Sequence, residues 1–486
     1  MPAPSRSTAA AVAAAALLAA CAAGPDYVRP TLDLPAAWKE AGPWKTAEPQ
    51  TADSRQPWWQ AYRDPVLNGL MVDAEAANQN IRLAEAQYRQ AQALADAARA
   101  GLYPSVGANA GAQRALTNSS GIKEGDVYSA GLAASWVPDL WGSVRRGIES
   151  GEAGVQASAD DLAAAHLGIQ AALAQDYLQL RITDQQRALY AATTEAYARA
   201  LKLTRAQRAA GIAFASDVAL AESQLTSAQA QAVDLEAARA QLEHAIAILT
   251  GRAPAQFDLP PLTEAQPFAI ELPATPPGLP SQLLERRPDI AAAERRAATA
   301  NANIGVARAA YYPNLVLSAS GGFSASALGS LFDTPSRVWS LGAALAQTVF
   351  DGGLRRAHDA QAVAAYDASV AQYKQTVLTG FQQVEDNLAT LRVLDREAEY
   401  QAQAVKAGQT AERLALSQYR AGTATYLAVV TAQTLSLTNQ RTAVQLRGRQ
   451  LAASVSLITA TGGGWNASDN RPATATSSAS TASPTP

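Results

Sequence analysis

The chain has few of the residues that build chemical sites and bulky cores. Among 486 residues there is 1 cysteine, which excludes an internal disulfide framework and any cysteine-based metal cluster. Aromatic residues make up only 6%, so the 48% hydrophobic content rests largely on alanine and favours closely packed long helices. The net charge of −3 provides no basic field, so we expect no nucleic-acid partner.

Catalytic motifs are also missing from the sequence. His166, His244 and His358 each lack a second ligand three or four residues away, so no metal site is predicted. There is no P-loop, no Gly-x-Ser-x-Gly element and no glycine-rich turn from a strand into a helix. Acidic residues are scattered as on solvated helix faces. We therefore expect neither an enzyme nor a cofactor.

The single cysteine, Cys21, ends a short apolar segment. Residues 8–20 are too few to cross a bilayer as a helix and are typical of a signal-peptide core. Leu-Ala-Ala-Cys at 18–21 resembles the bacterial lipoprotein signal, which predicts acylation of Cys21 and attachment to outer-membrane lipid. Ala22, where an aspartate would favour the inner membrane, fits that location. The alternative is a secretory signal that contains a cysteine by chance.

Two uninterrupted segments, 143–210 and 353–421, predict very long helices. Apolar residues recur in the second at steps of three or four, as in a coiled coil. About 70 residues of helix would be on the order of 100 Å long. Each segment ends at an Ala-Gly pair, where Gly211 or Gly422 can adopt the left-handed conformation of a helix C-cap.

Two segments with apolar residues at alternate positions, 104–138 and 313–350, predict β-hairpins. Each strand has about ten residues, the length that crosses a bilayer as a tilted barrel strand. The alternative is a pair of solvent-exposed β-ribbons. Four strands are too few to close a membrane barrel, so a pore would require three or more copies of the chain.

The chain contains an internal duplication. Tyr103-Pro104 returns as Tyr312-Pro313, and Thr250-Gly251 as Thr461-Gly462, at an offset of about 210 residues. We predict a signal peptide (1–20), an N-terminal extended segment and equatorial region (21–66), a first repeat (67–251), an equatorial linker (252–287), a second repeat (288–465) and a disordered tail (466–486). The first repeat would hold a helix (67–102), the hairpin 104–138, the long helix 143–210 and a helix (214–250), and the second the hairpin 313–350, the long helix 353–421 and a helix (424–461).

Several motifs in combination carry a resemblance to a known family. They include Leu-Leu-Glu-Arg-Arg-Pro-Asp-Ile at 283–290, Tyr-Arg-Ala-Gly at 419–422 and the closing Gly-Gly-Gly-Trp at 462–465. With these motifs the chain resembles the outer-membrane efflux proteins, the TolC-like channels, and in particular the NodT-type lipoproteins of RND efflux systems. The resemblance covers residues 21–465.

The resemblance implies a mixed α and β membrane protein. In a homotrimer, four strands per copy would complete a transmembrane β-barrel on a long periplasmic α-helical barrel. Such channels dock onto a periplasmic adaptor, the membrane-fusion protein, and an inner-membrane RND-type pump. We therefore expect a passive outer-membrane exit duct for drugs or other small solutes. The channel of a type I protein secretion system and a lipid-anchored periplasmic coiled-coil scaffold are the alternatives.

The resemblance also marks a candidate gate. The turns at Gly211 and Gly422, with Arg420 beside the second, would form the gated end that faces the adaptor. Leu427 matches a constricting apolar position of related channels. Well-known relatives carry an aspartate four residues further on, whereas this chain has Thr431. A ring of carboxylates attracts cations, so cation selectivity by that route is not expected here.

Two groups of charged residues are interpreted as structural. Asp217 is expected to stabilise a helix N-terminus through the helix dipole, with a pore role as the second interpretation. Arg286, Arg287 and Asp289 surround Pro288, a residue type favoured in the first helical position. We expect them to cap and brace the helix that begins there, with contact to solutes as the second interpretation.

Overall fold

The computed structural model describes residues 23–33, 35–40, 57–117, 123–262, 270–273 and 286–465. The expected signal peptide, Cys21, parts of the equatorial linker and the C-terminal tail lie outside these residues. The chain divides into two compact units. We call Met1–Leu32, Ala86–Ala159 and Ala292–Gln375 the sheet unit, and Asp33–Glu85, Asp160–Ala291 and Thr376–Pro486 the helical unit.

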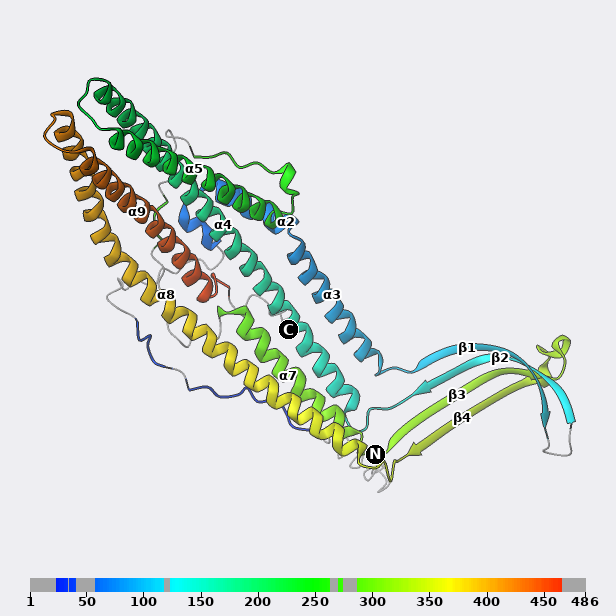
Figure 1. Cartoon of the computed structure of the whole chain (residues 1–486). Coiled ribbons are helices and arrows are strands. Elements are labelled where there is room, and N and C mark those ends of the chain that lie inside the picture. The colour runs from blue at the N-terminus through cyan, green and yellow to red at the C-terminus, as the bar shows by residue number, and fades with distance from the viewer. Residues whose placement is uncertain are drawn as a thin grey trace, which may run out of the picture. The chain divides into compact units, whose positions relative to one another are not determined.

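The described elements follow one another in an order that is nearly repeated (Figure 1). Helices α4 and α8 have 67 residues each, α5 and α9 have 35 each, and α3 and α7 have 22 each. Equal lengths in corresponding positions are what a duplicated module requires. The elements are η1 (Trp58–Tyr62), α2 (Pro65–Ala77), α3 (Gln79–Ala100), β1 (Ser105–Thr117), β2 (Lys123–Trp136), α4 (Ser143–Ala209), α5 (Ala215–Leu249), η2 (Pro254–Gln256), α7 (Pro288–Ala309), β3 (Asn314–Ala325), η4 (Leu328–Ser330), η5 (Thr334–Ser336), β4 (Arg337–Ala346), α8 (Leu354–Arg420) and α9 (Tyr426–Ala460).

The single helix expected at 67–102 is wrong, because Asn78 divides it into α2 and α3. Asn78 has an extended backbone (φ −65°, ψ 128°). Its side-chain oxygen accepts hydrogen bonds from the backbone N–H groups of Asn80 (2.8 Å) and Ile81 (3.2 Å). An asparagine side chain can replace the helical acceptors in this way and begin a new helix.

The same residue ties the start of α3 to the end of α5, and the second repeat has an equivalent contact. Asn78 donates a side-chain hydrogen bond to the carbonyl of Leu249 (2.8 Å). At the corresponding place Arg287 donates one to the carbonyl of Ala460, the last residue of α9 (3.2 Å). Two different side chains therefore stabilise the same helix joint in the two repeats.

A glycine completes each joint. Gly251 and Gly462 have φ values of +70° and +96°. A Cβ atom at Gly251 would lie 2.4 Å from the carbonyl oxygen of Ala77, and one at Gly462 would lie 1.8 Å from that of Arg286. Glycine is required at both places, since it tolerates positive φ and leaves room for the neighbouring backbone.

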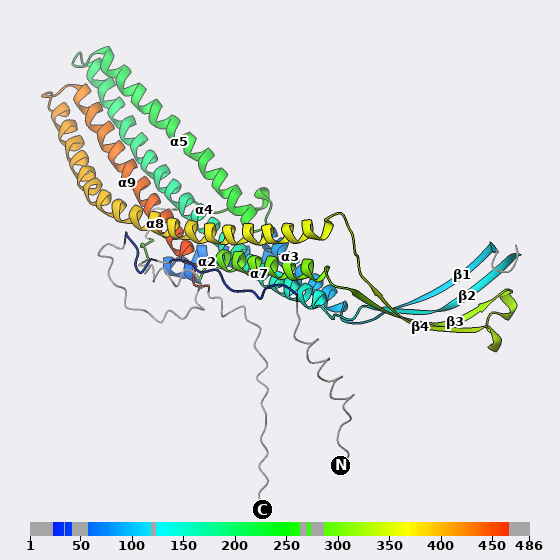
Figure 2. The ribbon, with the colours of Figure 1, turned by 90° about the horizontal axis from the view of Figure 1, so that it is seen from below.

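The sheet has the order β1-β2-β3-β4, with every neighbouring pair antiparallel. Figures 1 and 2 both show the four strands side by side beyond the helix ends of the sheet unit. Cross-strand partners share a face, so the register divides the sheet into an apolar and a polar face. The apolar face carries Val106, Ala108, Ala110, Ala112, Tyr128, Ala130, Leu132, Ala134, Trp136, Leu315, Leu317, Ala319, Phe323, Trp339, Leu341, Ala343 and Leu345, and towards the strand ends away from the helices it also carries the charged residues Arg114, Glu124, Asp126 and Arg337. The polar face carries Asn109, Gln113, Ser129, Ser135, Ser318, Ser320, Ser324 and Ser340 among glycine, alanine and the valines Val127, Val316 and Val338.

In the sheet unit the first described residues are held against the helices. The N–H of Ala23 donates to the carbonyl of Trp141 (3.0 Å), and Arg146 donates to the carbonyl of Ala23 (3.2 Å). The hydroxyl of Tyr27 donates to the carboxylate of Glu294 (2.5 Å). The described chain from Ala23 to Tyr27 is therefore held against the helices of the sheet unit and the segment that joins β2 to α4.

In the helical unit a buried carboxylate, Asp184, organises the segment after η2. Its side chain is 1% exposed and forms ion pairs with Arg181 (3.1 Å) and Arg239 (2.8 Å). Arg181 also donates to the carbonyl of Pro260 (2.8 Å), and Arg239 donates to that of Leu259. Buried ion pairs are retained only when further hydrogen bonds satisfy the charges. Here those bonds fix the beginning of the expected linker.

His166 and Glu75 form a half-buried contact between α4 and α2. The ring nitrogen Nδ1 of His166 lies 2.6 Å from the Glu75 carboxylate, which also accepts a bond from Gln170 (2.6 Å). The hydrogen bond to Glu75, aided by the nearby charges of Glu75 and Glu85, raises the pKa of His166. Burial alone would raise the pKa of Glu75, but the bonds from His166 and Gln170 lower it.

None of the helices in the described ranges combines enough length and apolar character to cross a membrane.

We predict that Gly462→Ala lowers the midpoint of thermal unfolding of the purified protein. The positive φ costs about 1–3 kcal/mol for a residue with a side chain, and the contact with Arg286 adds to this cost. Gly69→Ala is the matched control, because Gly69 lies in α2 and a Cβ atom there would have no heavy atom within 4 Å. Ala is the better helix former by about 1 kcal/mol, so the control should not lose stability. Equal midpoints for both variants would contradict the account of the joint.

A second prediction concerns pH. The pKa of His166 is raised, so its contact with Glu75 stabilises the fold fully below pH 6.5 and is lost as the pH rises through the raised value. Glu75 has a lowered pKa, so its contribution is present above pH 4.5 and is lost on further acidification. We expect the difference in unfolding midpoint between wild type and His166→Gln to be largest between these values, corresponding to about 1 kcal/mol or less. A difference that grows towards alkaline pH would contradict this.

Candidate functional site

The first helical turn joins α4 to α5 at Gly211, which has φ +77°. The N–H of Gly211 donates to the carbonyl of Arg208 (2.9 Å), and that of Ile212 to the carbonyl of Gln207 (2.8 Å). This is the Schellman pattern, which satisfies the last carbonyls of a helix through a left-handed glycine.

The second turn repeats this backbone between α8 and α9. Gly422 has φ +73°. Its N–H donates to the carbonyl of Tyr419 (3.0 Å), and that of Thr423 donates to the carbonyl of Gln418 (2.9 Å). The expectation of left-handed glycines at both turns agrees with these angles.

Both turns belong to the helical unit, where their side chains form one buried group that we call the tip cluster. Its two tyrosines, Tyr419 and Tyr426, pack edge to face with ring centroids 5.2 Å apart. The hydroxyl of Tyr419 donates to Thr204 on α4 (3.4 Å). Burial raises the pKa of Tyr426 to about 12, so this ring stays neutral at physiological pH. The cluster comprises Leu201, Val218, Ala221, Tyr419, Tyr426 and Val429.

The tip cluster leaves several side chains exposed around the turns. Ile212 is 69% exposed, Phe214 76% and Leu427 58%. Arg420 and Thr431 are exposed as well. The hydroxyl of Thr431 donates to the carbonyl of Leu427 (2.9 Å), so these two residues occupy adjacent turns on one side of α9. The structure thus brings the candidate gate residues of both turns into one region of the helical unit.

Asp217 has a local partner. Its carboxylate accepts a hydrogen bond from the backbone N–H of Phe214 (3.1 Å), the residue just before α5. A carboxylate in the first helical turn also interacts favourably with the helix dipole. This geometry supports the structural interpretation of Asp217.

Arg287 lies at the second helix joint with its side chain almost fully buried. It forms a two-pronged ion pair with Asp289 (3.0 and 2.6 Å) and donates to Gln383 on α8 (2.7 Å). Pro288 is the buried first residue of α7, whereas Arg286 is exposed. The contacts of Arg287 brace the start of α7 against α8 and α9, which supports its structural interpretation.

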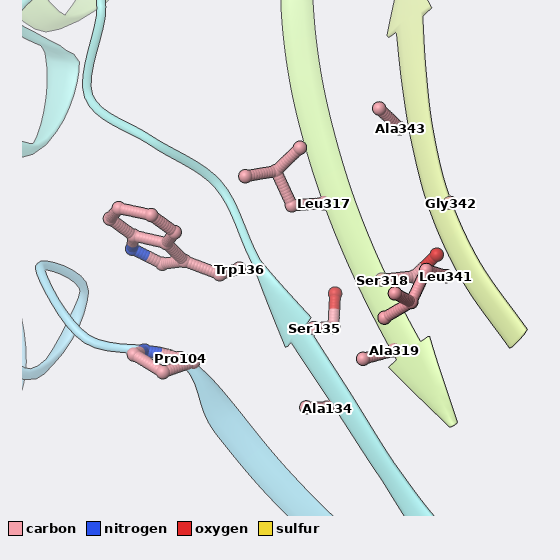
Figure 3. Close-up of a pocket in the computed structure, with 10 residues that line it drawn as sticks. All are labelled: Pro104, Ala134, Ser135, Trp136, Leu317, Ser318, Ala319, Leu341, Gly342 and Ala343. Atoms are coloured by element: carbon pink, nitrogen blue, oxygen red, sulfur yellow. The ribbon is translucent and has the colours of Figure 1, made fainter. Parts of the chain in front are cut away.

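Aromatic side chains border the apolar face of the sheet at both ends, which sequence reasoning missed. Tyr128 and Trp136 stand eight residues apart on β2, about 26 Å along a strand. Phe323 is level with Ala130, one residue pair from Tyr128 on this face, and Trp339 is level with Leu132, midway between the two ends. The rings of Trp141 and Tyr312 stack near the end of Trp136, with centroids 4.8 Å apart. An apolar band of about 25 Å between aromatic girdles is typical of outer-membrane barrels. Beside Trp136, Figure 3 shows a concavity on this face.

Two further features were not predicted. Tyr419 and Tyr426 flank the second turn, and the first turn has no equivalent pair. Their contact forms only when the helices pack together, so the local sequence does not reveal it. Arg181-x-x-Asp184 returns in the second long helix as Arg392-x-x-Asp395, where Arg392 forms an ion pair with Glu40. Comparing the repeats residue by residue would have revealed this motif.

The described residues contain no group of three or more His, Cys, Asp or Glu side chains that could hold a metal ion.

Comparison with known proteins identifies the family. The model of the outer membrane efflux protein family matches residues 70–252 and 279–463. The chain belongs to this family, which is a family of channels and not of catalysts.

Individual relatives resemble the chain over nearly its whole length. The pyoverdine export outer membrane protein OpmQ of Pseudomonas aeruginosa is 34% identical, covering 93% of this chain and 96% of the relative. The toluene efflux pump outer membrane protein TtgF of Pseudomonas putida is 31% identical over 96% and 98%. The solved outer-membrane channel OprN superposes with a TM-score of 0.85 at 30% identity, covering 92% of this chain and all of OprN. The open MtrE channel of Neisseria gonorrhoeae gives 0.80 at 29% identity over 91% and 98%.

These findings confirm the expected fold and general function. The chain is an outer-membrane channel of an efflux pump, with a helical barrel and a transmembrane β-barrel that is completed by trimerisation. The homotrimer works with a periplasmic adaptor and an inner-membrane pump. It lies in the cell outer membrane and extends into the periplasm.

We predict that Asp217→Asn leaves the ion selectivity of the reconstituted channel unchanged and costs little stability. Asparagine keeps an acceptor for the Phe214 N–H but removes the charge. Asp217→Ala removes the acceptor too and should lower stability by about 1 kcal/mol, measured as a lower unfolding midpoint. A changed cation-to-anion permeability ratio in Asp217→Asn would instead support the pore role.

Proposed function

We propose that this channel is a passive exit duct for small organic compounds and performs no chemistry of its own. This proposal rests on one observation: the chain is similar over nearly its whole length to relatives that are named for the export of different compounds. OpmQ is named for pyoverdine, TtgF for toluene and ArpC for antibiotics, at 34%, 31% and 31% identity. Relatives so similar in sequence carry dissimilar compounds, so substrate choice belongs to the partner pump.

The polar face of the sheet supports a weakly selective duct. Its side chains are mostly serine, glycine and alanine, with Asn109 and Gln113 on β1. Short uncharged groups neither attract nor exclude solutes by charge. If this face lines the lumen of the trimer, small compounds of either charge can pass.

We further propose that the turns at Gly211 and Gly422 form the adaptor-facing end and that Leu427 narrows the mouth there. Exposure of Leu427 and Thr431 on one side of α9 supports this placement. Arg420 would lie at the docking end. Asp217, Arg286, Arg287, Pro288 and Asp289 would keep the structural roles described above.

Two assignments concern segments outside the described residues. We propose that residues 1–20 are a lipoprotein signal peptide and that Cys21 is acylated. We also propose that residues 466–486 are a tail.

Within the rest of the chain, we propose that the first repeat covers 67–251, the linker 252–287 and the second repeat 288–465.

The exit-duct function is tested in a deletion strain of the source bacterium. We expect increased susceptibility to several small antibiotics and organic solvents, restored by the wild-type gene. The matched variant is Tyr419→Ala, which disrupts the tip cluster and should restore resistance only in part. Unchanged susceptibility together with the disappearance of one secreted protein would instead support a type I secretion channel. A chain found as a monomer in the soluble periplasm would support the scaffold.

We predict that Thr431→Asp makes the channel more cation-selective in planar bilayers. Three carboxylates at a narrow mouth raise the local cation concentration, so the cation-to-anion permeability ratio should rise several-fold at low salt. Thr431→Asn is the uncharged control of similar size and should leave the ratio near the wild-type value. The same ratio in Thr431→Asp and wild type would remove Thr431 from the constriction.

A further inference from the structure

The concavity on the apolar face of the sheet has a role that transport does not explain. We call it the apolar groove; most of its lining is apolar, with Pro104, Ala134, Trp136, Leu317, Ala319 and Leu341, and the two serines Ser135 and Ser318 line it as well. Figure 3 shows these side chains around it, on β2, β3 and β4 and on the segment before β1. No charged residue lines it.

The groove is built from large side chains around small ones. Ala134 and Ala319 are direct partners across β2 and β3. Their side chains are small, so they leave space between the larger side chains of Trp136, Leu317 and Leu341. Trp136 is held in place because its indole N–H donates to the carbonyl of Leu102 (3.0 Å). This bond favours the observed orientation of the ring, beside the groove. Apolar surface of this kind is stabilised by contact with hydrocarbon.

The groove lies at the end of the sheet where the N-terminal segment is anchored. Ala23 bonds to Trp141, whose indole N–H donates to the carbonyl of Pro313 (2.7 Å), just before β3. Leu317 follows four residues later, about 13 Å along the strand. In the sequence, Cys21 is two residues before Ala23.

We propose that an acyl chain on Cys21 occupies the apolar groove of its own protomer. This rests on the proposed acylation of Cys21. The location is suitable, because Trp141 bonds both to Ala23 and to Pro313, and the groove residue Leu317 is four residues beyond Pro313. The chemistry is suitable as well, since an unbranched hydrocarbon fits between Trp136 and Leu341 without leaving a polar group unpaired. The acyl chain thus fixes the N-terminal segment to the barrel.

The test uses cells fed with a palmitate analogue that carries a photoactivatable diazirine. After irradiation, the trimer is purified and digested, and cross-linked peptides are identified by mass spectrometry. We expect the peptide that contains Cys21 to be joined through the acyl chain to peptides that contain Leu317 or Leu341. Cys21→Ser should lose these peptide pairs.

Leu341→Trp fills the groove and should reduce the cross-linked pairs several-fold, with labelling of Cys21 and the yield of trimer unchanged. Leu132→Trp is the matched control, because Leu132 is an exposed leucine on the same face but outside the groove. It should leave the pairs at the wild-type level.

Two results would overturn the inference in distinguishable ways. If Cys21 is labelled but its acyl chain cross-links only to membrane lipid or evenly over the apolar face, the groove does not hold it, although the acylation stands. If groove peptides carry the same lipid label in Cys21→Ser, the occupant is a membrane lipid. Absence of label on Cys21 in the wild type would refute the acylation itself and the groove assignment with it.

Discussion

The unpaired edges of the sheet determine the assembly. Within the described chain β1 and β4 each pair with one strand only, and the apolar face extends across all four strands. In a bilayer every backbone N–H and C=O needs a partner inside the protein. The outer edges of β1 and β4 must therefore bond to other copies of the chain. Trimerisation is thus a condition for the barrel to exist in the membrane.

The duplication explains how one chain supplies equivalent parts to such a ring. Helices of equal length recur, and each repeat closes the same joint with a left-handed glycine next to a backbone carbonyl. The contacts differ in detail, with Asn78 in one joint and Arg287 in the other. The turns differ too, since only the second carries the tyrosine pair of the tip cluster. The repeats share a backbone, and their side chains have diverged where the two halves have different neighbours.

Elements that form within one continuous segment of the chain could be predicted from the sequence. Helical and alternating periodicities are local, so the long helices, the hairpins and the glycine turns follow from the pattern alone. The break at Asn78 could not be predicted, because asparagine ends a helix only when its side chain finds the right partners, here including Leu249. The tip cluster and the buried Asp184 depend on packing between distant segments. At the candidate site, the cap formed by Asp217 was visible in the local sequence, whereas the surroundings of Leu427 and Thr431 were not.

The most direct test of this account is disulfide formation between the sheet edges. In a Cys21→Ser background, cysteines are placed on β1 and β4, for example Asn109→Cys with Ser340→Cys and neighbouring pairs that sample the register. Within one protomer these strands are about 14 Å apart, too far for a disulfide. We predict that oxidation in membranes yields covalent dimers and trimers for at least one pair, and nothing larger. A ladder that continues beyond three chains, or no intermolecular product for any pair, would contradict the closed three-copy barrel.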